Sequence, residues 1–321
     1  MLQVIPPRPG HPELVVMASG RTSLGDLDHV GIVDLYKRHG AILFRGFGTD
    51  LAAFGRFARS FCRSAVVNES PNREPLDPAN HVYAVDGGTG AFPLHPELSR
   101  EPWKPDVAFF ACFSAPGEGG ETTICDGIAL VRALPADVRA GLTERRLVYG
   151  MGTWPGLLEY WLGTSEPSDA QLGAPPRGCP YAFGRRPDGH IVRHFSRPAL
   201  HKPMFSNERA FGNFLLFARY NNGRRDFPLL DDLRPVPEVW VEAAKFAGDA
   251  QTRAIEWERG DVLMLDNTRF MHGRNAIRDA GERRIATYFG YLDFAVPDPE
   301  EPVDPIWRRE NFVPPQPPGF S

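Results

Sequence analysis

Two histidines and one glutamate give the clearest chemical signal in this chain of 321 residues. His95 and Glu97 are separated by a single residue, and His272 lies far downstream in a polar stretch that continues into Gly273 and Arg274. Two imidazoles and one carboxylate form a 2-His-1-carboxylate facial triad, which suits non-heme Fe(II) and leaves coordination positions open for oxygen chemistry. The three residues therefore predict an oxygenase site.

The spacing of the first two ligands is compatible with a β-strand. Residues i and i+2 of a strand point to the same face, so His95 and Glu97 can reach one metal while Pro96 is turned away. A proline also favours the edge of a sheet or the mouth of a barrel. The triplet alone is a weak signal, and His272 is equally compatible with an ordinary turn, so the prediction depends on the rest of the chain.

Three further residues predict an anion-binding function near the metal. Arg283 and Arg284 follow His272 and open an apolar strand, where a guanidinium can bind a carboxylate through two hydrogen bonds. Thr122 begins another strand-like segment and offers a hydroxyl to the same anion. The alternatives are a solvated strand end for the arginines and the ordinary β-propensity of threonine.

The segments that must position these residues alternate between strand-like and helical patterns. We expect strands at 41–47, 107–113, 121–126, 147–151, 254–257, 262–265 and 284–292. We expect helices over 23–38 and 128–145, and a further helix that begins after Thr49 as its N-cap. The segments 205–220 and 237–251 are expected to be helical or mixed. The runs 107–113 and 121–126 flank a Pro- and Gly-rich connection, which predicts a hairpin.

Length and composition favour one mainly antiparallel β domain with helical additions. We expect a single domain over 1–321, with its core at about 40–292. The region 150–253 is expected to be inserted, with an exposed loop or lid at 164–180 that is rich in Pro, Gly and Ser. Residues 297–321 are expected to form a Pro-rich C-terminal tail.

Charge and cysteine content exclude several classes of protein. The formal net charge is -4 and the pI is about 6.2, which disfavours binding to nucleic acid or to an anionic membrane surface. The N-terminal residues lack the pattern of a secretory leader and no apolar run reaches membrane-spanning length, so we expect a cytoplasmic protein. The 4 cysteines contain no C-x-x-C pair, which predicts free thiols. The oligomeric state stays open.

Several short motifs occur in a characteristic order along the chain. They are His95-x-Glu97, Gly119-Gly120-Glu121-Thr122, Gly260-Asp261, Asp266-Asn267, His272-Gly273-Arg274 and Arg283-Arg284-Ile285. This order resembles that of the Fe(II)- and 2-oxoglutarate-dependent oxygenases of the taurine dioxygenase and clavaminate synthase type. The resemblance runs from about residue 40 to residue 292, and it implies a double-stranded β-helix (jelly roll, cupin-like).

The resemblance also implies the roles of the site residues. Fe(II) is expected on His95, Glu97 and His272, with 2-oxoglutarate and O2 as co-substrates. Thr122 and an arginine are expected to bind the distal carboxylate of 2-oxoglutarate. We prefer Arg284 to Arg283, because the family's arginine directly precedes the apolar part of the last strand.

The expected reaction is hydroxylation of an unactivated C–H bond. Glu97 stands where taurine dioxygenase has aspartate, which favours the clavaminate synthase side of the family and an amino-acid or carrier-tethered aminoacyl substrate, as in antibiotic biosynthesis. Because related halogenases have a small residue at this position, halogenation is disfavoured. Basic residues could bind a carboxylate or phosphopantetheine group of the substrate, although a solvated basic face is at least as good an explanation: Arg274, Arg185, Arg186, Arg193 and Arg197.

Other functions remain open. Desaturation or epoxidation could occur at the same iron centre. A zinc hydrolase could use the same three ligands, but it gives no role to Thr122 or to the arginine pair. A non-catalytic jelly-roll binding protein is the remaining alternative, because this fold hosts many functions.

Overall fold

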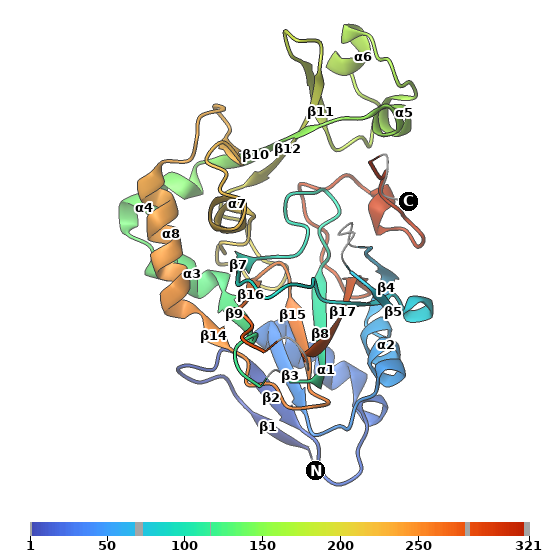
Figure 1. The fold of residues 1–321 in the computed structure, drawn as a ribbon, viewed down its shortest axis with the longest axis vertical. Coiled ribbons are helices and arrows are strands. Elements are labelled where there is room, and N and C mark those ends of the chain that lie inside the picture. The colour runs from blue at the N-terminus through green and yellow to red at the C-terminus, as the bar shows by residue number, and fades with distance from the viewer. Residues whose placement is uncertain (1, 68–72, 116, 280–282, 318–321) are drawn as a thin grey trace.

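The chain is folded mainly into β-sheets, with helices packed on their outer faces (Figure 1). The computed structural model describes residues 2–67, 73–115, 117–279 and 283–317. Its strands form three sheets, two of which carry the core of the molecule. No helix in these described ranges is both long enough and apolar enough to span a membrane.

The largest sheet runs through the centre of the molecule. Its strands follow the order β1 (Gln3–Ile5), β2 (Leu14–Met17), β3 (Ala41–Arg45), β15 (Val262–Asp266), β8 (Val107–Ser114), β17 (Arg284–Leu292), β6 (Val82–Ala84) and β5 (Pro75–Asp77), and β4 (Cys62–Ala65) also pairs with β17. All neighbours are antiparallel except β2 and β3. The predicted strands at 41–47, 107–113, 262–265 and 284–292 thus lie side by side.

Both faces of this sheet are buried, which explains its continuous apolar runs. Alternate residues such as Leu43 and Phe110 face the smaller sheet, and the intervening residues, such as Phe44 and Phe109, face helices. Those helices are α1 (His29–His39) and α2 (Leu51–Arg59).

The smaller core sheet carries His95 and His272. Its order is β14 (Arg253–Ala254), β9 (Thr122–Asp126), β16 (Phe270–Arg274) and β7 (Phe92–His95). On its other side lies a second apolar cluster, to which Met271 and Leu94 contribute. The helices of this layer are α3 (Gly127–Ala133), α4 (Ala136–Thr143), α7 (Leu215–Tyr220) and α8 (Glu238–Gln251).

The third sheet belongs to the region that we expected to be inserted. It has the order β11 (Ala182–Arg185), β12 (Ile191–Pro198), β10 (Arg146–Gly152) and β13 (Leu229–Leu230). Together with α5 (Pro155–Leu162) and α6 (Asp169–Gly173) it extends away from the core, at the top of Figure 1. Short 3-10 turns occur at Leu24–Asp26, Pro78–Asn80 and Ile306–Arg308. The division of the chain into core, insertion and tail stays a prediction.

The predicted hairpin between 107–113 and 121–126 is wrong. β8 pairs with β15 and β17 in the largest sheet, whereas β9 pairs with β14 and β16 in the smaller one. The glycine-rich connection therefore passes from one sheet to the other. Gly119 is required there, because its φ is 72° and an added Cβ would lie 2.2 Å from the carbonyl oxygen of Ala276.

Several element boundaries also differ from the prediction. Asp50, not Thr49, caps α2, accepting a hydrogen bond from the backbone N–H of Ala53. The helix expected over 128–145 is divided into α3 and α4, and Pro135 caps the second of them. The helix expected over 205–220 is confined to α7.

Two buried ion pairs tie distant segments to the core. Arg45 at the end of β3 pairs with the fully buried Asp261, which gives the Gly260-Asp261 turn a structural role. Arg308 in the C-terminal segment binds Asp106 through two hydrogen bonds of 2.8 and 3.0 Å. Such bidentate pairs fix geometry as well as charge.

Candidate metal centre

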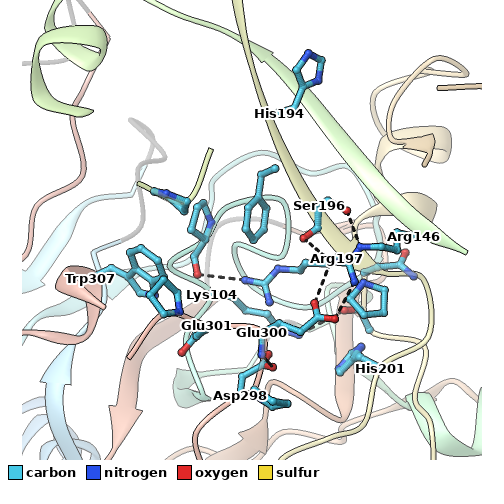
Figure 2. Close-up of a pocket in the computed structure, with 18 of the residues that line it drawn as sticks. Lys104, Arg146, His194, Ser196, Arg197, His201, Asp298, Glu300, Glu301 and Trp307 are labelled. Atoms are coloured by element: carbon cyan, nitrogen blue, oxygen red, sulfur yellow. Dashed lines mark hydrogen bonds and ion pairs between the residues drawn. The ribbon is translucent and has the colours of Figure 1, made fainter. Parts of the chain in front are cut away.

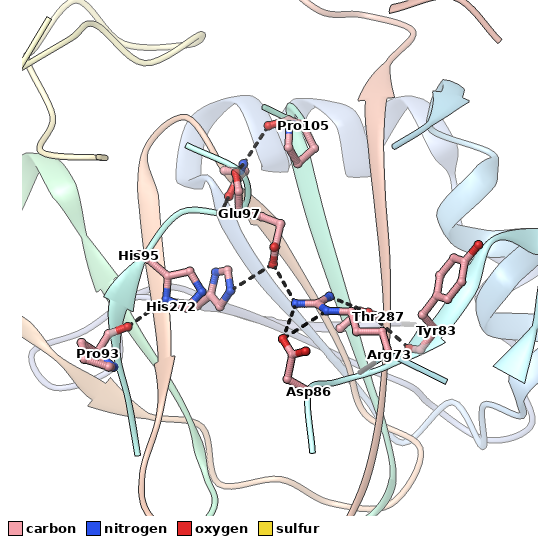
Figure 3. Close-up of polar contacts among 10 residues, drawn as sticks. Arg73, Tyr83, Asp86, Pro93, His95, Glu97, Pro105, His272 and Thr287 are labelled. Carbon is pink, nitrogen blue, oxygen red and sulfur yellow. Dashed lines mark hydrogen bonds and ion pairs between the residues drawn. The ribbon is translucent and has the colours of Figure 1, made fainter. Parts of the chain in front are cut away.

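His95, Glu97 and His272 lie together at the end of the smaller core sheet (Figure 3). His95 ends β7 and is the direct cross-strand partner of His272 on β16, with ring centroids 4.6 Å apart. One donor atom from each of the three residues lies within 4.8 Å of the other two. Within the described residues this is the only such cluster of at least three ligand side chains. The structure thus brings the sequence-predicted triad together.

Glu97 reaches the cluster from a turn and not, as expected, from the strand that holds His95. β7 ends at His95, and the buried side chain of Asn267 fixes the turn that follows. The Asn267 amide oxygen accepts the backbone N–H of Glu97 at 2.8 Å, while its nitrogen donates to the carbonyl oxygens of Glu97 and Pro105 at 3.2 and 2.8 Å. Asn267 was part of a recognised motif, but its spacing gave no signal of this role.

The protonation states of the triad suit metal binding. His95 Nδ1 lies 2.8 Å from the carbonyl oxygen of Pro93, which can only accept, so Nδ1 carries the proton and the Nε2 lone pair is free for a metal. Burial, followed by the nearby His272, lowers the pKa of His95 to about 4. Burial alone would raise the pKa of Glu97, but Arg73 and the two histidines hold it well below its usual range. The site therefore offers a neutral imidazole and an anionic carboxylate at neutral pH.

Arg73 is a site residue that the sequence analysis missed. Its Nη2 lies 3.3 Å from Glu97 Oε2 and 3.2 Å from Asp86 Oδ2 (Figure 3). Its guanidinium also stacks over Phe289. Arg73 lies just before β5, and nothing in its local spacing distinguishes it from other loop arginines. Its position beside the carboxylate ligand makes it an electrostatic partner of the metal site.

A small cavity of about 40 Å³ adjoins the triad. It is lined by Arg73, Val85, Asp86, Phe92, His95, Phe110, Thr122, His272, Gly273, Arg274 and Arg283. Thr122 and Arg283, from the predicted anion-binding group, therefore meet at the metal cluster.

Arg283 has an uncompensated charge in this cavity. Its Nε donates to the Gly120 carbonyl oxygen at 2.8 Å, and within the described part of the chain no carboxylate forms an ion pair with it. Burial, and then the neighbouring Arg274, lower the pKa of Arg283 to about 10. Thr122 is buried beside it and accepts a hydrogen bond from Trp257 Nε1 at 3.1 Å, which leaves the hydroxyl proton of Thr122 available to an anion.

Arg284 is placed elsewhere. It is exposed and lines a surface depression with Thr49, Asp50 and Arg259. Adjacent residues of a strand point to opposite faces, so only one of the two arginines can face the triad. The structure places Arg283 there.

Arg274, His194 and His201 have other surroundings. The guanidinium of Arg274 donates to the carbonyl oxygens of Asp86, Gly88 and Gly90, and thereby holds the 86–90 loop against the site. His194 and His201 line a different cavity and do not join the metal cluster.

The fold and this site define a class of protein: a jelly roll that carries a non-heme metal centre beside an anion pocket. The family model described as taurine catabolism dioxygenase, TauD/TfdA family, matches residues 20–288. The chain belongs to this family. The predicted fold class is thereby confirmed, although the sheets of the described residues do not close into a barrel. The chain is an Fe(II)- and 2-oxoglutarate-dependent oxygenase.

Solved structures share this fold across almost the whole chain. A putative α-ketoglutarate-dependent taurine dioxygenase from Burkholderia xenovorans has a TM-score of 0.61 at 14% identity, covering 94% of this chain and 96% of that chain. PvcB from Pseudomonas aeruginosa has a TM-score of 0.57 at 16% identity, covering 93% and 94%. AAD-2, solved with Mn(II) and N-oxalylglycine, has a TM-score of 0.57 at 12% identity, covering 93% and 100%. No curated protein matches the sequence significantly.

The side chains present fit Fe(II) and 2-oxoglutarate. Two imidazoles and an anionic carboxylate, His95, His272 and Glu97, are the ligand set expected for non-heme Fe(II). The half-buried guanidinium of Arg283 lacks an anionic partner among the described residues, and it lines the same cavity. A dicarboxylate that reached from the metal to Arg283 would supply ligand oxygens to the metal and an anionic partner to the guanidinium.

Proposed function

We propose that this oxygenase hydroxylates an unactivated C–H bond of an amino acid or of a carrier-tethered aminoacyl group, in specialised metabolism. His95, Glu97 and His272 hold the iron, and Thr122 and Arg283 bind the distal carboxylate of 2-oxoglutarate. The observation that carries the proposal is that His95 and His272 of the triad line one cavity together with the Arg283 guanidinium, which has no ion-pair partner among the described residues. The choice of Arg283 replaces the preference for Arg284 drawn from the sequence, because Arg284 lies outside this cavity.

The substrate class depends on Glu97. Its resemblance to the glutamate of the clavaminate synthase type supports an amino-acid-like substrate, and the presence of a carboxylate at this position disfavours halogenation. PvcB is described as an Fe, α-ketoglutarate-dependent oxygenase from an isonitrile synthetic pathway, but its similarity extends here to the fold alone.

The iron with its co-substrates supplies the oxidising chemistry, and the chain supplies orientation, charge and exclusion of water. Arg73 keeps Glu97 anionic and holds its carboxylate toward the histidines. Phe217 and Phe110 pack against the rings of His95 and His272, at centroid distances of 4.5 and 5.0 Å, and shield the ligands from solvent. Arg283 and Thr122 fix the far end of the co-substrate, so that its near end is held at the metal.

The cavity has room for only a few water molecules. 2-Oxoglutarate and a substrate are larger, so we expect the side chains at its rim to move when they bind. Arg73 is the foremost of these, because its contacts with Glu97 and Asp86, at 3.3 and 3.2 Å, are at the long end of the hydrogen-bonding range.

Two measurements test the proposal. Anaerobic addition of Fe(II) and 2-oxoglutarate should give a weak visible charge-transfer band, which a zinc hydrolase or a non-catalytic binding protein would not give. Arg283→Gln should weaken the dependence of that band on 2-oxoglutarate, while the matched variant Arg284→Gln should leave it unchanged. A band that responds to Arg284→Gln and not to Arg283→Gln would reverse the assignment.

The substrate class is tested by turnover. Iron-loaded enzyme is incubated with 2-oxoglutarate and a panel of free and carrier-bound amino acids while succinate is measured. Hydroxylation adds one oxygen to the substrate, whereas desaturation, the alternative at the same centre, removes two hydrogens. If no amino acid in either form stimulates succinate release, the proposed substrate class is wrong even though the iron chemistry stands.

A further inference from the structure

A second cavity, far larger than the one at the metal, lies between the third sheet and the C-terminal segment (Figure 2). Its volume is about 770 Å³, within the range of cavities that hold small organic molecules. Residues from β12, from the loop before β8 and from the C-terminal segment line it, and none of them lines the small cavity at the triad.

Lys104 is an unpaired cation at this cavity. Its side chain is 7% exposed, and its only hydrogen bond in the described structure is a long one, 3.4 Å, to the carbonyl oxygen of Gly212. Within the described ranges no carboxylate lies within 4.0 Å of its Nζ; Asp266, Asp298 and Asp106 act on it only over longer distances. An ammonium has three donors, and burial without a partner is costly.

Arg197 adds a second cation to the same wall. Its Nη2 donates to the carbonyl oxygens of Glu101 and Pro102, at 3.0 and 3.2 Å, while its Nε is buried without an acceptor. The guanidinium stacks over Phe195, and no carboxylate among the described residues pairs with it. Arg197 is one of the arginines singled out in the sequence, and its surroundings are not those of a solvated basic face.

The cavity has an excess of donors over acceptors. Trp307, which also lines it, has a buried indole N–H without an acceptor. Three acidic side chains of the C-terminal segment also line the cavity, but none forms an ion pair with Lys104 or Arg197. Glu300 pairs with Arg146, Glu301 pairs with Arg308, and Asp298 accepts the backbone N–H of Glu300. Buried donors normally have partners. The missing partner is therefore a group that only accepts hydrogen bonds and carries negative charge.

We propose that this cavity binds a small organic molecule through an oxyanion, a phosphate ester or a carboxylate, held by Lys104 and Arg197. The apolar surfaces of Phe195 and Trp307 contact the body of the molecule. A cavity of this size is much larger than an inorganic ion, which is why an organic anion is the better match. The proposal goes beyond the oxygenase function and does not require turnover.

Binding of four probes by calorimetry tests the proposal: inorganic phosphate, phenyl phosphate, benzoate and neutral phenol. The full chain is used with and without Fe(II). We expect saturable binding of phenyl phosphate or benzoate, and weaker binding at higher salt. Preference between the two identifies the anion as phosphate or carboxylate. Equal binding of phenol, or no saturable binding of either organic anion, would overturn the proposal.

Variants locate the binding. Lys104→Met and Arg197→Gln should each lower the affinity for the organic anion about tenfold or more, as expected for loss of a charge-assisted hydrogen bond. Arg283→Gln removes the guanidinium of the metal cavity and should leave this binding unchanged, which excludes binding in the 2-oxoglutarate pocket. Arg132→Gln, on the surface, is the matched control for charge. If Lys104→Met does not fold, Arg197→Gln decides: unchanged affinity in that variant refutes the site.

Discussion

The cavity at the triad and the cavity at the C-terminal segment differ in almost every respect. The cavity at the triad is small, about 40 Å³, and its side chains form a recognisable set of metal ligands with an adjoining guanidinium. The cavity at the C-terminal segment is about 770 Å³ and offers buried cations, but its described residues form no cluster of metal ligands. The candidate active site is therefore identified by which side chains converge there and not by the size of the cavity.

The two cavities also differ in how the sequence encodes them. The proposed metal ligands His95 and Glu97 are two residues apart in the sequence, and His272 belongs to a second compact motif. Lys104, Arg197 and Trp307 come from three distant segments and share no spacing. A local motif made the first site visible, whereas only the tertiary structure assembles the second.

The largest effect is expected when one of the proposed metal ligands is removed, because this tests whether the small cavity is the site of the chemistry. His272→Ala deletes one of the three donors, and we expect 2-oxoglutarate turnover to fall by at least about a thousandfold, because the remaining catalysis of a damaged site is orders of magnitude weaker. Succinate release and bound iron are measured together, and thermal unfolding checks that the variant is folded. Retained turnover in a folded variant would mean that the chemistry takes place elsewhere.

The pair of adjacent arginines gives a sharper test of the small cavity. Arg283→Gln should raise the KM for 2-oxoglutarate by about 10- to 100-fold, since a hydrogen bond to a charged group contributes about 1.5 to 3 kcal/mol. Arg284→Gln changes an exposed side chain outside the cavity and should leave the KM within about twofold. Steady-state kinetics of both variants separate the two assignments, and equal effects would contradict both.

The smallest expected effect concerns the large cavity. Burial, and then Arg197, lower the pKa of Lys104 from 10.5 to about 7. The folded chain therefore binds fewer protons than the unfolded chain between these pH values, so Lys104 makes the free energy of unfolding rise with pH across that window. The contribution is at most about 1.4 kcal/mol per pH unit.

Urea unfolding at pH 7 and pH 9 measures this contribution. Lys104→Met should flatten the rise of the free energy of unfolding with pH, while Lys245→Met, at an exposed lysine paired with Asp249, should not. Parallel pH profiles for the wild type and Lys104→Met would show that burial does not lower the pKa of Lys104.

The elements that sequence predicted well are those in which one pattern determines the outcome. The apolar runs at 41–47, 262–265 and 284–292 are strands because both faces of the largest sheet are covered. The helix expected over 237–251 is present as α8, since its period matches a single apolar face.

The failures arise where tertiary contacts decide. The Pro- and Gly-rich connection before Thr122 has the composition of a hairpin turn, yet the pairing of β8 and β9 with other strands makes it a crossing between sheets. Glu97 lies in the turn after β7, so it does not continue the alternation of side chains expected within a strand. Asn267 accepts its backbone N–H and holds this turn. Which of Arg283 and Arg284 faces inward depends on strand register, which a single sequence does not fix.

The amide of Asn267 has a consequence for how such an enzyme can change over evolution. One side chain bonds both Glu97 and Pro105, so it fixes the two ends of the loop that carries a metal ligand at one end and Lys104 near the other. Pro102 and Lys104 lie in this loop and line the large cavity, so their substitution would change that cavity while Asn267 still holds the backbone of Glu97. Ligand recognition by the large cavity can therefore change through this loop without a change in the residues of the triad.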